Sequence, residues 1–338
     1  MAEIITIDRH IQERALLFPH ATGNFSGLLQ HIALASKVIA NEVRRAGLID
    51  VLGSTGESNI QGEVVQKLDN IAHDSLTDMM INSGYIAVMA SEEEEEIIVV
   101  PKDKSRGNYV VNFDPLDGSS NIDANVSIGT IFSILQRVTP ENEEPSNSDC
   151  MQLGTKQLAA GYVIYGSSTM FVYTSGAGTH GFTYDPSIGE FLLSHPNIIT
   201  PDYGTIYSAN MGNQNYWSEG VRKYIHDMHQ KDKARKTPYS CRYIGSMVAD
   251  VHRNLLYGGI FMYPADTKKD PKQPKPKLRL LYEANPFAFI VEQAGGRAID
   301  GVNNIMDIEP TGLHQRVPLF IGSKDNIDEI QDYIRKYG

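Results

Sequence analysis

A run of ten residues, Asp114 to Asp123, constrains this chain more than any other stretch. It reads Asp-Pro-Leu-Asp-Gly-Ser-Ser-Asn-Ile-Asp, and it directly follows the apolar segment Tyr109 to Phe113, which predicts a short buried strand. Pro115 fixes one φ and lacks an N–H, and Gly118 allows the backbone to turn. Two carboxylates and a loop rich in donors suit Mg²⁺ and phosphate, but the same residues also suit an ordinary Asx-rich turn.

Other acidic residues follow other predicted strands. Glu92 and Glu93 come after the predicted strand Tyr85 to Ala90, and Glu283 lies at the end of the predicted strand Leu278 to Tyr282. Ligands of open α/β sheets gather at strand ends, so these acids could converge with Asp114 and Asp117. Two carboxylates about 4 Å apart repel by roughly 4 kcal/mol. The acids are therefore either dispersed or neutralised by cations, and the second case predicts a site for two or more Mg²⁺ ions, with Mn²⁺ as a substitute.

The remaining pattern predicts an α/β chain with a domain boundary within 197–204, where prolines and Gly204 cluster. Apolar spacing predicts a helix over 24–46 and another over about 62–82, separated by a Gly/Ser/Asn-rich loop over 50–62. Asp69, on the second helix, is the candidate general base with Glu93, although a plain surface role is the alternative. Further strands are predicted at 97–100, 128–138, 158–163, 169–175, 179–183, 259–263 and 318–322, and further helices at 215–229, 246–257, 286–295 and 327–337.

Composition excludes several classes of protein. The net charge of −11 disfavours nucleic acid as a partner, because a phosphate backbone needs a basic surface. No stretch approaches 18 consecutive apolar residues, so no membrane span is expected. Two cysteines rule out a disulfide framework and fit a cytoplasmic location.

Several cationic and polar residues could bind a sugar phosphate beside the acids. The candidates share a place on predicted strand or loop edges: Lys277, Arg279, Arg242, Tyr243, Tyr263 and Asn210. Each of them alone is more typical of a structural or surface residue. The lysine-rich loop between Pro264 and Lys277 likewise predicts a solvated turn. Together with the acids they indicate a pocket for a phosphomonoester.

Four motifs resemble those of class I fructose-1,6-bisphosphatase, a family within the inositol-monophosphatase-like superfamily. They are Ser91-Glu92-Glu93, Asp114 to Asp123, Arg242 to Arg253 and Lys277 to Pro286, and the resemblance extends from about Thr22 to the C-terminus. It implies a five-layer αβαβα fold, with an N-terminal domain over 1–198 and a C-terminal α/β domain over 199–338. It also implies a homotetramer that removes the 1-phosphate of fructose 1,6-bisphosphate in gluconeogenesis, with Mg²⁺ as cofactor.

The resemblance also implies roles for individual residues. Asp69 and Glu93 resemble the pair that activates water, and the loop 50–62 resembles a dynamic loop that closes over the site. Asn210, Arg242, Tyr243 and Tyr263 match the 6-phosphate pocket, which Arg242 enters from a neighbouring subunit. The implied metal ligands are Glu92, Glu93, Asp114, Asp117, Glu283 and the Leu116 carbonyl. The implied contacts to the reacting part of the substrate are Ser119, Ser120 and Lys277. Asp117, Gly118 and Arg279 are further candidates for binding the substrate.

Regulation and specificity stay open at this point. A possible AMP site consists of Thr22, Gly23, Ser26 and Tyr109, but Asn108 and Gln136 replace two cations of the family's pocket, unless Arg137 substitutes for one of them. The alternatives are a sedoheptulose-1,7-bisphosphatase, alone or as a second activity, and a non-catalytic sensor of sugar phosphates or nucleotides. The intact set of acids argues against the sensor, because binding alone does not need an Asp69 that activates water.

Overall fold

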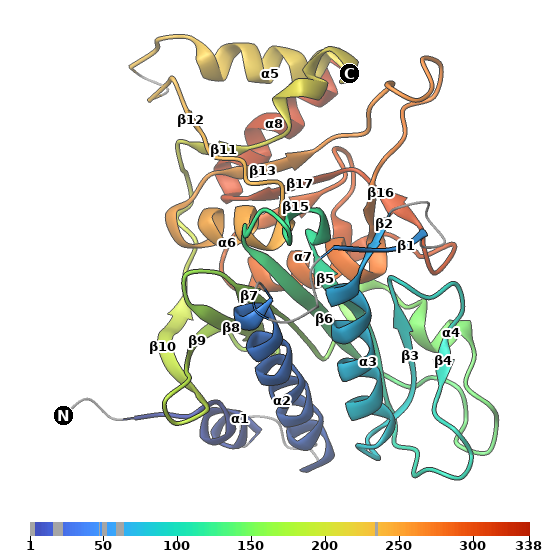
Figure 1. The fold of residues 1–338 in the computed structure, drawn as a ribbon. Coiled ribbons are helices and arrows are strands. Elements are labelled where there is room, and N and C mark those ends of the chain that lie inside the picture. The colour runs from blue at the N-terminus through green and yellow to red at the C-terminus, as the bar shows by residue number, and fades with distance from the viewer. Residues whose placement is uncertain (1–3, 16–22, 47, 49–52, 59–63, 234–235) are drawn as a thin grey trace.

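Two β-sheets form the framework of the molecule. In the computed structural model, residues 4–15, 23–46, 48, 53–58, 64–233 and 236–338 are described (Figure 1). The larger sheet has eight strands, in the order β10 (Glu190–Ile198), β9 (Thr179–Asp185), β8 (Thr169–Thr174), β7 (Ala159–Tyr165), β6 (Ile128–Gln136), β5 (Tyr109–Asp117), β3 (Ile86–Ser91) and β4 (Ile98–Val99). The smaller sheet has five, in the order β12 (Ser240–Cys241), β11 (Ile206–Ser208), β13 (Ile260–Tyr263), β17 (Leu319–Gly322) and β15 (Arg297–Ile299).

Helices cover both faces of each sheet and produce five layers (Figure 1). The first layer holds α1 (Ile7–Ala15), α2 (Gly23–Arg45) and α3 (Lys67–Ile81), whose apolar side chains share one core with the eight-stranded sheet. The middle layer holds α6 (Met247–Tyr257) and α7 (Asn285–Gln293), which pack between the two sheets. The last layer holds α5 (Glu219–His229) and α8 (Lys324–Tyr337), on the outer face of the five-stranded sheet. The expected αβαβα architecture is confirmed.

The middle layer joins the two halves of the chain. Its core combines Ile131 and Tyr162 of the large sheet with Phe287 of α7 and with Phe261 and Ile321 of the small sheet. The Phe287 ring stacks on Tyr162, with 5.0 Å between the ring centroids. The two-domain division at 198/199 falls at the end of β10 and stays a prediction.

Several predicted elements need correction. Residues 64–66 form a strand, β2 (Val64–Gln66), and not the start of a helix; β2 pairs with β1 (Ser54–Ser58), inside the segment predicted to be a loop. The predicted strand Leu278 to Tyr282 ends at Arg279: β14 (Leu278–Arg279) pairs with β16 (Arg316–Val317), and Leu280–Ala284 forms one turn of π-helix. Helix α1 and strand β10 were missed, because α1 is polar and β10 has no clean alternation.

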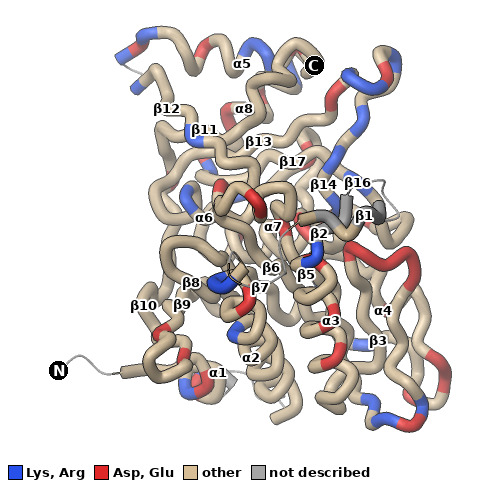
Figure 2. The backbone as a smooth tube through the Cα atoms, viewed as in Figure 1, with Lys and Arg blue, Asp and Glu red and all other residues tan. Residues whose placement is uncertain are grey.

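Other predictions match the structure closely. Helices α2, α3, α5, α6, α7 and α8 and strands β3 to β9, β13 and β17 lie within a few residues of the predicted ranges. The five lysines of the loop between β13 and β14 are exposed, as a solvated turn requires. Figure 2 shows this loop, with several blue segments, projecting at the top right. Within the part of the chain that is described, no helix is long and apolar enough to cross a membrane. A short helix, α4 (Asn147–Cys150), lies beside β3 and β5.

Candidate active site

The acidic residues meet because β3 and β5 are neighbouring parallel strands. Ser91, the last residue of β3, lies opposite Phe113 of β5, so the acids that follow leave the sheet at one edge. The N–H of Glu92 donates to the carbonyl of Phe113 at 3.0 Å, which places Glu92 beside Asp114. The prediction that strand ends gather these acids is confirmed for this pair of strands.

A β-bulge places Asp114 and Asp117 on one face. Strand β5 extends through Asp117, and between these two residues it has one residue more than β6, since Asp114 faces Ile131 and Asp117 faces Gly129. Residues three apart in a regular strand point to opposite faces, and the extra residue of the bulge removes that difference. Pro115 suits the bulge because it has no N–H to pair. Its carbonyl accepts the hydroxyl of Thr130 at 2.9 Å instead.

Glu283 reaches the same place from a different kind of element. It lies in the π-helix Leu280–Ala284 that leads into α7, and not at a strand end as predicted. The N–H of Arg279 donates to Glu283 Oε2 at 2.5 Å and thereby fixes the carboxylate. Wide helical turns of this kind recur at functional sites.

Three buried carboxylates form the centre of the site. One ligand oxygen from each of Asp114, Asp117 and Glu283 lies within 4.8 Å of the others. Each side chain is also held by the protein: Asp114 Oδ1 accepts the N–H of Leu116 at 3.0 Å, and Asp117 Oδ2 accepts the Ser246 hydroxyl at 2.9 Å and the Val248 N–H at 3.0 Å. Oxygen ligands held this way fit a hard divalent cation.

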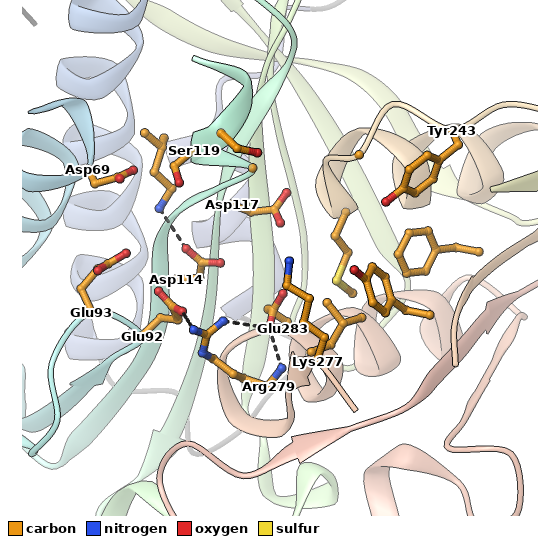
Figure 3. A pocket seen from close by; sticks show the side chains of 18 residues that line it. Asp69, Glu92, Glu93, Asp114, Asp117, Ser119, Tyr243, Lys277, Arg279 and Glu283 are labelled. Carbon is orange, nitrogen blue, oxygen red and sulfur yellow. Dashed lines mark hydrogen bonds and ion pairs between the residues drawn. The ribbon is translucent and has the colours of Figure 1, made fainter. Parts of the chain in front are cut away.

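Arg279 supplies positive charge within this cluster. Its guanidinium forms an ion pair with Glu92 and lies 4.0 Å from Glu283 Oε2, and its side chain is only 6% exposed. The residue was predicted to contact substrate, and the structure places its charge among the acids of the pocket wall (Figure 3). Part of the repulsion expected between the acids is thus offset from inside the protein.

Burial raises the pKa values of the acidic side chains. It raises the pKa of Glu92 and of Asp114 well above the ordinary range, and Arg279 opposes both shifts. Burial also raises the pKa of Asp117, against the hydrogen bonds from Val248 and Ser246. For Glu283, burial raises the pKa to about 7, against the pull of Arg279. A cluster of carboxylates with raised pKa values in one pocket is typical of a functional site.

The acids open into a pocket of about 450 Å³. Asp69 of α3 and Glu93 lie on one side of it, and Tyr243 lies on the other (Figure 3). Asp69 is buried and faces the pocket, so its alternative role as a surface residue is wrong. The predicted site residues that line the pocket are Asp69, Glu92, Glu93, Asp114, Leu116, Asp117, Gly118, Ser119, Ser120, Tyr243, Tyr263, Lys277, Arg279 and Glu283.

The backbone after Asp117 turns sharply. Gly118 has φ of 79°, and a Cβ there would lie 3.0 Å from the Cβ of Ser246. The turn starts a short 3₁₀ helix, Ser119–Asn121, which presents both serines to the pocket. A residue with a side chain would be strained at Gly118 and would press on the residue that holds Asp117.

Four lining residues were not predicted: Gly245, Met247, Phe261 and Leu278. Gly245 and Met247 lie within the Arg242 to Arg253 motif, and Phe261 is two residues before Tyr263 on β13, which puts both on one face. That spacing would have been a usable signal for Phe261. Leu278 lies between two predicted residues, and its place depends on the short strand β14.

Two predicted residues do not line the pocket. Arg242 is exposed, and its Nη1 donates to the carbonyl of Cys241 at 2.8 Å. Asn210 is also exposed and accepts the N–H of Gly212 at 3.2 Å, at the start of the 3₁₀ helix Met211–Tyr216. Neither side chain is among those that line the pocket.

The described residues of the possible AMP site do not line this pocket. Thr22 is outside the described residues, Gly23 and Ser26 lie in the first turn of α2, and Tyr109 begins β5. Phe25 links these elements, because its ring centroid is 5.9 Å from that of Tyr109. Arg137 binds Thr139 and the carbonyls of Pro140 and Glu143, so its guanidinium is engaged in the following loop.

Comparison with known proteins gives the same family over both halves of the chain. The model of the fructose-1-6-bisphosphatase N-terminal domain matches residues 5–196, and that of the C-terminal domain matches residues 200–335. A class 1 fructose-1,6-bisphosphatase of Chloroherpeton thalassium is 58% identical over 98% of this chain and 94% of its own length. One of Maridesulfovibrio salexigens is 53% identical over 99% of both chains.

Solved structures agree with this comparison. The holo form of Leishmania major fructose-1,6-bisphosphatase is 43% identical, with a TM-score of 0.89 over 98% of this chain and 99% of the other. A structure of the same protein described as the T-state is 42% identical, with a TM-score of 0.85 and the same coverage.

The raised pKa of Glu283 predicts that the metal-free protein loses stability as pH rises. An unfolded glutamate ionises near pH 4.5, whereas Glu283 in the folded protein ionises near pH 7, so ionisation favours the unfolded chain across this interval. We expect the free energy of unfolding in EDTA, from urea titrations, to fall between these pH values. Millimolar Mg²⁺ should reduce the loss, because a cation favours the ionised carboxylates.

The variant Glu283→Gln should flatten this dependence, and Glu309→Gln, at an exposed position, should leave it unchanged. A stability of the wild-type protein that stayed level in EDTA from pH 4.5 to 7 would contradict the interpretation.

Proposed function

Because this chain belongs to the class I fructose-1,6-bisphosphatase family, we propose that it hydrolyses the 1-phosphate of fructose 1,6-bisphosphate to give fructose 6-phosphate and phosphate. The observation that supports this activity most is the meeting of Asp114, Asp117 and Glu283 beside Asp69 and Glu93 in one pocket. A protein that only bound sugar phosphates would not need so many buried acids at unfavourable pKa values. The reaction belongs to gluconeogenesis, and we place it in the cytoplasm.

We propose Mg²⁺ as the cofactor, in two or more positions, with Mn²⁺ as a substitute. The ligands would be Glu92, Glu93, Asp114, Asp117, Glu283 and the carbonyl of Leu116, which are hard oxygen donors. When bound, such ions polarise the phosphoryl oxygens and lower the pKa of a coordinated water. The buried acids support this assignment, because a cation offsets their repulsion.

The side chains of the pocket have separable tasks. A water attacks phosphorus, the bond from phosphorus to the sugar oxygen breaks, and the sugar oxygen takes up a proton from solvent. Asp69 and Glu93, on one side of the pocket, accept the proton that the water loses. Lys277 and the two serines after Gly118 hold the phosphate, while Tyr243 and Tyr263 hold the distal part of the substrate.

The exposed position of Arg242 supports an oligomer with shared pockets. Tyr243 lines the pocket of its own subunit, but Arg242 does not, because its exposed side chain binds the carbonyl of Cys241. We propose a homotetramer in which Arg242 binds the 6-phosphate in a neighbour's pocket. Helix α2 also leaves Leu34 and Val38 exposed on one side, 50% and 38% respectively, as a subunit contact would require.

We propose that AMP inhibits this enzyme weakly. Asn108 and Gln136 stand where cations would bind the nucleotide phosphate, and they bind protein groups: Gln136 Nε2 donates to the Asn108 carbonyl at 2.9 Å, and Asn108 Nδ2 donates to Glu141 at 2.7 Å. Neutral amides bind phosphate less strongly than charged groups do.

The first prediction concerns turnover. Asp69→Asn and Glu93→Gln should each lower kcat by roughly a hundred- to ten-thousand-fold, the usual range for loss of a general base. Phosphate release from fructose 1,6-bisphosphate in Mg²⁺ measures this, and EDTA should abolish release by the wild-type protein. Asp74→Asn, at an exposed position on the same helix, serves as the matched control. Absence of release by the wild-type protein under these conditions would refute the proposed function.

The second prediction concerns shared pockets. Arg242→Ala should raise KM about tenfold or more, because a desolvated contact between arginine and phosphate is lost. Oligomers mixed from Arg242→Ala and Asp69→Asn subunits should regain activity, since some pockets then combine an intact Asp69 with an intact Arg242 of the neighbour. If mixing restored nothing although the subunits exchanged, Arg242 would act within its own subunit.

The third prediction concerns AMP. Millimolar AMP should reduce wild-type activity only slightly, and the double variant Asn108→Lys, Gln136→Arg should be inhibited more strongly because two cations are restored. An AMP titration of phosphate release compares the two proteins. Strong inhibition of the wild-type protein would overturn this expectation.

A further inference from the structure

His73 lies beside the residues proposed to activate water, although its position in the sequence does not distinguish it. It is four residues after Asp69 on α3, which places both side chains on one face of the helix. Its side chain is 13% exposed, and its Nδ1 lies 3.0 Å from the hydroxyl of Ser91. Ser91 is fully buried at the end of β3.

Ser91 in turn binds the backbone of Glu93. The Ser91 Oγ accepts the N–H of Glu93 at 3.3 Å, and the Ser91 carbonyl accepts the N–H of Glu94 at 3.3 Å. These two bonds shape the turn by which the chain leaves β3. The hydroxyl that holds the backbone of Glu93 is therefore oriented by a histidine on the helix that carries Asp69.

The face and the Nε2 atom of the His73 ring contact other residues near the acids. Its face stacks on Phe113, with 5.9 Å between the centroids and 27° between the planes, and Phe113 directly precedes Asp114. Its Nε2 lies 3.5 Å from Glu94 Oε1 and 3.5 Å from the hydroxyl of Thr77. One imidazole thus contacts the three segments that bring Asp69, Glu93 and Asp114 together.

Asp69 and Glu93 can share the proton of one water only if the two side chains are held in fixed positions relative to each other. Asp69 and Glu93 come from a helix and from a loop, and a displacement of about 1 Å between catalytic groups can cost a hundredfold in rate. We propose that His73, through the hydroxyl of Ser91, is a positioning residue that holds Glu93 against Asp69. This inference rests on the proposed hydrolase function and assigns His73 no contact with substrate.

The two ring nitrogens can be tested separately. In His73→Asn the amide stands near the place of Nδ1 and keeps a partner for Ser91, whereas in His73→Gln it stands near the place of Nε2. His73→Leu and Ser91→Ala remove the connection altogether. The matched control is His31→Leu on the neighbouring helix α2, because His31 is also partly buried and its Nδ1 hydrogen bonds the carbonyl of Gly27 at 2.8 Å, remote from the acids.

We expect His73→Leu, His73→Gln and Ser91→Ala to lower kcat about tenfold or more, with KM for fructose 1,6-bisphosphate nearly unchanged. His73→Asn should recover most of kcat. The double variant His73→Leu, Ser91→Ala should be no slower than the worse single variant, because both act through one connection. Wild-type kcat in His73→Leu, or equal recovery by Asn and Gln, would overturn the proposal.

A second readout does not depend on turnover. In Mn²⁺ titrations followed by the melting temperature, His73→Leu and Ser91→Ala should need several-fold more Mn²⁺ for the same increase, whereas His31→Leu should match the wild-type protein. Unchanged Mn²⁺ titration in both variants would count against a role in holding Glu93. Failure of the wild-type protein to release phosphate would refute the proposed function itself, whereas wild-type release with unaltered variants would refute only the role of His73.

Discussion

The burial of several carboxylates at one edge of the large sheet is the constraint on which the rest of the site depends. Buried charges of one sign are tolerated only when other groups compensate for them. Here the compensation is local and comes from distant parts of the sequence. Arg279 pairs with Glu92, the N–H of Arg279 holds Glu283, and the start of α6 holds Asp117. Burial nevertheless raises the pKa values of Asp114 and Glu283, and a divalent cation would offset the cost of their negative charges.

The layered fold and the cluster of buried acids are consequences of the same topology. The single parallel pair of the large sheet, β3 with β5, sends two acidic segments out at one edge. The bulge in β5 then turns Asp114 and Asp117 toward the same side, and the π-helix before α7 adds Glu283 from the middle layer. The site therefore lies where three layers meet, and its acids cannot be understood from one motif alone.

Much of this could be predicted from the sequence, for physical reasons that differ between residues. The spacing of apolar residues predicts amphipathic helices such as α2 and α3. The meeting of the acids after β3 and β5 is predicted by the rule that parallel strands end at one edge of a sheet. Glu283 was assigned correctly to the pocket but to the wrong element, because apolar residues in Leu280–Ala284 suit a strand as well as a helix. The pairing of Arg279 with Glu92 and the contact of His73 with Ser91 join residues far apart in the chain. No local pattern encodes such contacts, which depend on how the layers pack.

The hydrogen bonds from the start of α6 to Asp117 affect how the two halves of the molecule can move. The carboxylate belongs to the large sheet, but its Oδ2 is bound by Ser246 and Val248 of a helix that packs against the small sheet as well. A rotation of one half of the molecule against the other would have to stretch these bonds or move Asp117 with α6. The same carboxylate thus ties the large sheet to α6, so its removal would loosen the contact between the two halves as well as alter the pocket.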